Sequence, residues 1–113
     1  MSVWQQIQQT REELKLTLEE SKQLGIKWVA HKAKYESVKA RRALDLKGQG
    51  MAATVIDKVL KGDPEVNEAM YDMDVAEVEY RNAVEAINVL KKDYDFLREQ
   101  YQREWNESGW SSR

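Results

Sequence analysis

Helix-breaking residues are nearly confined to one short segment of this chain of 113 residues. Three of the five glycines (Gly48, Gly50 and Gly62) and the only proline, Pro64, lie within residues 48–64. Elsewhere Gln, Glu, Lys, Leu and Ala are abundant, all of which favour helix, and no segment alternates with the period of two that is typical of strands. The chain is therefore predicted to be all-α, with a long helix on either side of one interrupted segment.

Each long helix begins with a capping signal. Ser2 and Gln5 form a capping box, in which the hydroxyl accepts a hydrogen bond from the backbone N–H of Gln5 and the amide side chain reaches back. Asp63 is placed to cap a helix that has Pro64 at its first position, where the missing N–H is harmless. The predicted organisation is a single domain, 1–113, with helices over 2–47 and 63–106 and a frayed tail over 107–113.

An amphipathic segment lies between the breakers. Its apolar residues share one helical face, whereas Thr54, Asp57, Lys58 and Lys61 lie on the other. We expect a short helix over 51–61 at the tip of the hairpin. This tip helix either caps the end of the hairpin or leaves it to lay its apolar face in the groove of a protein partner. The candidate partner-binding residues are Met51, Val55, Ile56, Val59 and Leu60.

Apolar residues repeat along both long helices at alternating steps of three and four, the period of coiled-coil packing. The second long helix carries this stripe from Ala69 to Tyr101, and the first carries a weaker one from Ile7 to Arg42. A long antiparallel, coiled-coil-like hairpin follows. If Lys47 lies beside Pro64, large residues face small ones along the seam. The facing pairs are then Trp28 with Ala83, Tyr35 with Ala76, Arg42 with Ala69, Val38 with Met73, Thr10 with Tyr101 and His31 with Tyr80.

The charge pattern supports this hairpin. Residues 26–50 are mainly basic and residues 63–79 are acidic without a base, so an antiparallel arrangement sets opposite charges side by side. Two helices leave many apolar residues off the seam, which predicts a homo-oligomer that assembles into a bundle. The alternative is a monomer with the tip helix folded over one face. The residues left off the seam are Ile26, Val29, Leu44, Leu46, Met70, Val75, Val78, Val84, Val89 and Phe96.

The sequence offers little for catalysis. It has no cysteine, a single histidine (His31) and no Glu-x-x-His pair of the kind that holds di-iron sites. Acidic pairs such as Asp74 and Glu77 would hold magnesium only if acids from a second helix converged on them, and the facing helix is basic. We therefore expect no enzymatic activity, no cofactor and no metal.

The basic half of the first helix is the candidate nucleic-acid contact. Cationic residues there are interleaved with Trp28, His31 and Tyr35, as on surfaces that hold a phosphate backbone and stack bases. The alternative is pairing with the acids of the facing helix, and the balanced chain charge of −2 shows no general preference for polyanions. The candidate contacts are Lys32, Lys34, Lys39, Arg41, Arg42 and Lys47.

Residues 48–101 resemble small uncharacterised helical proteins of bacteriophages and prophages. The likeness rests on the Gly-x-x-Ala-Thr-x-Ile turn that begins at Gly50, the Gly62-Asp63 break and the acidic helix with Ala and Tyr in its seam. It implies a non-enzymatic accessory role near DNA. The expected function is a non-catalytic, oligomeric phage accessory protein that acts through protein–protein contacts. The alternative is a nucleic-acid-binding factor in phage DNA replication or recombination.

The same features set the expected location. No run of about 18 apolar residues is present, so no membrane span is expected. The absence of cysteine is compatible with a reducing compartment. We expect a cytoplasmic protein, in the cytoplasm of the host cell if a phage encodes it.

Overall fold

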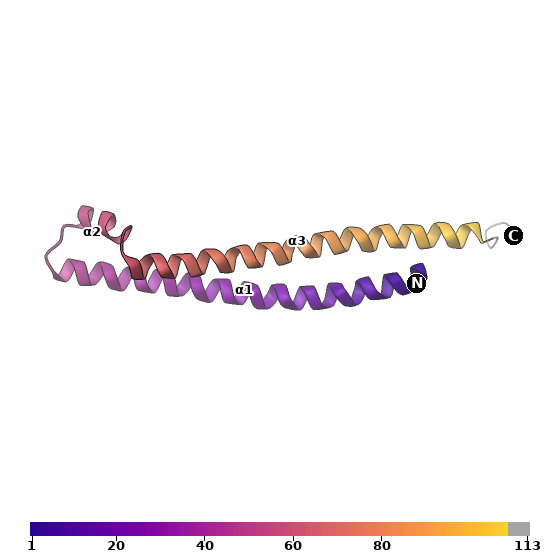
Figure 1. Cartoon of the computed structure of the whole chain (residues 1–113), viewed down its shortest axis with the longest axis horizontal. Helices are drawn as coiled ribbons and strands as arrows, with labels where there is room; N and C mark the ends of the chain where they lie inside the picture. The colour runs from indigo at the N-terminus through magenta and orange to yellow at the C-terminus, as the bar shows by residue number, and fades with distance from the viewer. Residues whose placement is uncertain (109–113) are drawn as a thin grey trace. The chain divides into compact units, whose positions relative to one another are not determined.

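The computed structural model describes residues 1–108 and contains three helices: α1 (Val3–Gly48), α2 (Ala53–Leu60) and α3 (Pro64–Glu107) (Figure 1). No β-strand occurs among these residues. The predicted all-α hairpin with a short helix at the turn is confirmed, and each predicted helix end lies within two residues of the observed one. Of the tail predicted over 107–113, everything after Ser108 lies outside the described residues.

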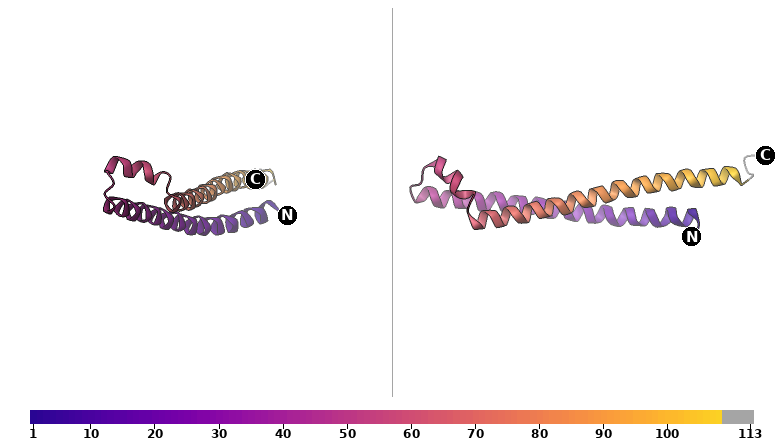
Figure 2. Two further views of the ribbon diagram at one scale, coloured as in Figure 1. Left: turned by 60° about the vertical axis from the view of Figure 1, so that its left-hand side comes forward. Right: turned by 45° about the horizontal axis from the view of Figure 1, so that its top comes forward.

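The chain packs as two compact units. The central unit is Gln23–Arg81, and the terminal unit combines Met1–Lys22 with Asn82–Arg113. In the central unit, the second half of α1 and the first half of α3 run antiparallel beside each other. Figures 1 and 2 both show α2 next to the C-terminal end of α1.

The core of the central unit lies where the three helices meet. Leu46 of α1, Ile56 and Leu60 of α2 and Val66 of α3 are buried together. Further along the seam, the rings of Trp28 and Tyr80 stack with their centroids 5.5 Å apart. Four half-buried residues pack against the central cluster: Tyr35, Val38, Ala43 and Met51.

The terminal unit is built from the two remaining halves of α1 and α3. The predicted capping box is present, with Gln5 N donating to Ser2 Oγ (3.1 Å) and Ser2 N donating to Gln5 Oε1 (3.0 Å). The Trp4 and Tyr101 rings lie 5.6 Å apart. Its buried residues are Ile7, Thr10, Ala83 and Ile87.

The predicted stripes are correct, but the predicted pairing between them is wrong. Every residue of both stripes is buried or half-buried. Tyr80, however, which was expected opposite His31, stacks on Trp28. Val38, expected opposite Met73, packs against the cluster that contains Val66. For these α3 residues, the observed partner on α1 therefore lies several residues away from the predicted partner.

Other contacts show the same displacement. Arg42, expected opposite Ala69, pairs with Asp63, and Tyr101 contacts Trp4 in place of Thr10. Leu46, which the spacing places off the seam, is buried because α2 covers it.

The repeat of the α3 seam explains the error. Ala69, Ala76 and Ala83 recur every seven residues. A shift of one heptad therefore still sets large residues of α1 opposite small ones, and size matching cannot distinguish the two registers. One contact that distinguishes them in the structure is that between Arg42 and Asp63, the residue before α3.

Candidate interaction surfaces

The five candidate residues of the tip helix divide between the core and the surface. Ile56 and Leu60 are buried against α1 and α3, and Met51 is half-buried. Val55 and Val59, one turn apart, are 45% and 40% exposed. The helix therefore caps the hairpin with one side, and of the five candidate residues only the two valines are exposed.

The backbone on both sides of α2 holds the helix in this place. Gly50 adopts a φ of 86°, a left-handed conformation that favours glycine, and turns the chain out of α1. At the other end, Asn67 Nδ2 donates to the carbonyl of Lys61 at 3.2 Å. The Asp63 carboxylate accepts from the backbone N–H groups of Glu65 and Val66 at 2.9 and 3.1 Å, as predicted for the cap of α3.

Arg42 ties this corner to α1. Its Nε donates to Asp63 Oδ2 at 2.8 Å, and its Nη1 lies 3.4 Å from Asp45. The hydrogen bond from Arg42, supported by the N–H of Val66, lowers the pKa of Asp63. The same hydrogen bond raises the pKa of Arg42. Arg42 was a candidate nucleic-acid contact, and in the structure its guanidinium is occupied by two carboxylates.

Two charged rows line one side of the central hairpin. The basic row is Lys27, Lys34 and Arg41, and the acidic row is Glu65, Asp72 and Glu79, each spaced by seven residues. Lys27 Nζ lies 3.1 Å from Glu79, and Arg41 pairs with Glu65. Among residues 1–108, neither Lys34 nor Asp72 takes part in an ion pair, although they occupy the middle of these rows.

The other candidate cations do not continue the basic row. Lys32 and Lys39 are seven residues apart and lie on the opposite flank of α1, by the spacing of the helix. The Lys39 ammonium sits 5.8 Å above the Tyr35 ring. Lys47 is in the last turn of α1. The six candidate contacts therefore lie on more than one side of the helix and do not form a single stripe.

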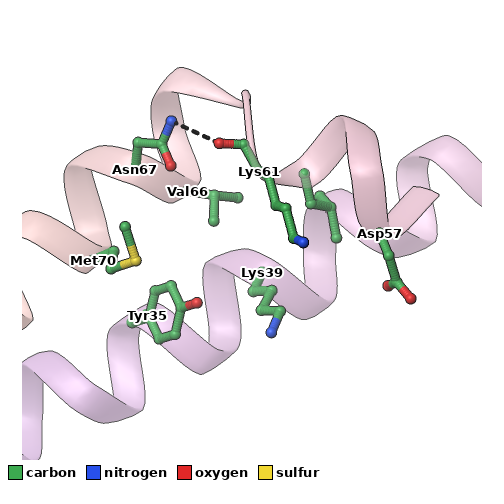
Figure 3. A pocket seen from close by; sticks show the side chains of 8 residues that line it. Tyr35, Lys39, Asp57, Lys61, Val66, Asn67 and Met70 are labelled. Atoms are coloured by element: carbon green, nitrogen blue, oxygen red, sulfur yellow. Dashed lines mark hydrogen bonds between the residues drawn. The ribbon is translucent and has the colours of Figure 1, made fainter. Parts of the chain in front are cut away.

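A hollow of about 540 Å³ opens beside Lys39, between α1, α2 and α3 (Figure 3). Leu60, Val66 and Met70 form its apolar wall, and Lys61 reaches across it towards the helix that carries Tyr35 and Lys39. Asp57 and Asn67 complete its lining. The sequence pattern did not single out this hollow, because it depends on how α2 docks.

The described residues show no further site of recognisable chemistry. No three His, Asp or Glu side chains of residues 1–108 come together as ligands for a metal ion. His31 is half-buried in the seam. In the part of the chain that the structure describes, no helix is long and apolar enough to cross a bilayer.

Comparison with known proteins leaves these surfaces as the guide to function. No family model, curated protein or solved structure matches the chain.

Proposed function

We propose that this chain is a non-catalytic helical protein that assembles with copies of itself and acts through protein–protein contacts. The supporting observation is the amount of large apolar surface that the hairpin leaves open. In the central unit, Val29 is 64% exposed and Tyr71 is 68% exposed, and both lie on helix sides that face away from the seam. Contiguous exposed apolar surface on a small helical protein is typical of a contact surface.

The resemblance of residues 48–101 to small phage proteins supports an accessory role. Such a role needs no catalytic constellation, and protein contact would be its means of action. Sedimentation velocity over a wide range of protein concentration tests the proposal. Species larger than the monomer that grow with concentration are expected, whereas a monomer at every concentration contradicts self-assembly.

A second function, nucleic-acid binding, is favoured by one specific observation. Lys39 and Lys61 flank the hollow between the helices, and no ion pair occupies either of them within the described residues. Fluorescence anisotropy of labelled single-stranded DNA, titrated across salt, measures this binding. Replacing both lysines with Ala is expected to weaken it and to flatten its salt dependence. Unchanged binding would show that these lysines are not part of the contact. No binding at low salt would contradict nucleic-acid binding altogether.

A further inference from the structure

α1 has a second regularly spaced face, opposite the one that packs against α3 in the central unit. We define the α1 outer face as Ile26, Ala30, Ala33, Ser37, Ala40 and Leu44, which follow one another at alternating steps of four and three residues. This is the spacing of a helix–helix seam. All six side chains are exposed, including the large ones, Ile26 and Leu44.

α3 presents its own outer face at the same level of the hairpin. We define the α3 outer face as Tyr71, Val75 and Val78, again at steps of four and three. All three are exposed, and they are bulkier than the alanines and the serine in the middle of the α1 outer face. Bulky side chains on one helix and small ones on the other are the condition for close packing of two helices.

The charged rows border these outer faces as well as the seam. Lys34 follows Ala33 of the α1 outer face and precedes Tyr35 of the seam, so it lies on the flank between them. In the same way, Asp72 lies between Tyr71 and Met73. A helix that packs on the α1 outer face therefore lies beside the basic row. A helix of complementary charge carries an acidic row on the matching flank, as α3 does.

We infer that a second copy of this chain docks its α3 outer face, antiparallel, on the α1 outer face. The occupant is set by charge: the acidic row of the second copy would lie beside the basic row of the first. Lys34 and Asp72 make no ion pair among residues 1–108; Lys34 is exposed and Asp72 is half-buried. This inference rests on the self-assembly proposed above.

The register follows from the pairs already present in the hairpin. We set the basic row of the first copy against the acidic row of the second in the register seen within the hairpin, where Lys27 pairs with Glu79 and Arg41 with Glu65. This register also aligns the two outer faces. Ala33 then lies opposite Val75 of the second copy, and Ser37 lies opposite its Tyr71. At these levels the contact joins a small residue of α1 to a bulky residue of α3.

Charge also excludes the two-fold alternative. In a two-fold antiparallel contact, the α1 outer face of one copy packs on the α1 outer face of the other. The basic rows of the two copies then face each other. Lys34 would then lie beside Lys34 of the second copy, and like charges side by side destabilise the contact. A two-fold contact of the α3 outer face would set Asp72 beside Asp72. Only the contact between different faces joins opposite rows, and it leaves one free face on each copy, so that association continues beyond the dimer.

Two single-face variants test the inference. Ala33→Glu sets a carboxylate against the acidic row of the docking copy, and Val75→Lys sets an ammonium against its basic row. Thr54→Glu and Thr54→Lys add the same charges at an exposed position of α2, away from both faces, and serve as matched controls. Circular dichroism is expected to show that all four variants remain folded, because each substituted side chain is exposed.

Sedimentation velocity of the variants, alone and mixed, gives the decisive readout. Wild type and the Thr54 variants are expected to form species larger than a dimer, and each single-face variant is expected to need about tenfold or more protein to associate. An equimolar mixture of Ala33→Glu and Val75→Lys retains one intact contact and sets the two introduced, opposite charges against each other at the other contact, so it is expected to associate at lower concentration than either variant alone. Association of either single-face variant like wild type, or a mixture that stays monomeric, overturns the assignment of the faces while self-assembly stands. A monomeric wild type overturns both.

Discussion

Leu60→Ala is the sharpest test of the way in which α2 is held. Leu60 is 4% exposed and packs with Leu46, Ile56 and Val66. The substitution removes about three buried carbon groups at about 0.8 kcal/mol each, which predicts a loss of about 2.5 kcal/mol in the free energy of unfolding. Urea unfolding followed by circular dichroism at 222 nm, about the wavelength of the helical band, measures this loss.

Val59→Ala is the matched control, because Val59 precedes Leu60 in the same helix and is 40% exposed. Its replacement is expected to cost about 0.5 kcal/mol or less. Hydrogen exchange separates undocking from global unfolding: in Leu60→Ala the amides of α2 should exchange faster than those at the centre of α1. Equal losses for the two variants would refute the packing of Leu60 against the hairpin and return the tip helix to the role of a free partner-binding segment.

Three further perturbations follow from single contacts. The pKa of Asp63 is lowered in the folded chain, so its contribution to stability is present above the unfolded value of about 3.9 and is lost as pH falls through the folded value. Urea midpoints should therefore fall below about pH 4 in wild type, and less so in Asp63→Asn. Ala76→Leu is expected to cost about 1–3 kcal/mol in urea unfolding, because Ala76 is 1% exposed and has no space for a larger side chain. Gly25→Ala gains about 1 kcal/mol of helix propensity, and its added Cβ meets the Tyr80 ring at 3.2 Å. A raised thermal midpoint would show that the ring gives way, and a lowered one that its stacking on Trp28 holds it in place.

The sequence predicted the elements of this fold because their signals are local. The Ser2 capping box, the Asp63 cap and the three-and-four spacing of the stripes each depend on residues within two turns of one another. The pairing of the long helices depends on residues far apart in the sequence. Because Ala69 and Ala76 are equivalent under a shift of seven, only a contact outside the repeat could have fixed the register.

The candidate surfaces show the same division. The two unburied tip residues, Val55 and Val59, could not be told from Ile56 and Leu60 by sequence, because all four lie on the apolar face of the helix. The position of α2 on the hairpin decides which of them is covered. Arg42 was grouped with the lysines by its charge, but the fold places it beside Asp63. The burial of Leu46 has the same origin, since α2 covers it.

The extent of the outer face gives the final argument for its role. At the corresponding positions of α1 nearer the N-terminus, Glu12, Glu19 and Gln23 are polar and Leu16 is the one apolar residue, and the unbroken series of apolar and small residues begins at Ile26. The basic row begins at the next residue, Lys27. Ion pairing within the hairpin explains the charges but does not require exposed alanines beside them. Helix propensity favours alanine but does not require the alanines to follow the spacing of a seam. A docked helix with an acidic flank and bulky side chains accounts for both features over the same stretch, and within this chain α3 has that combination.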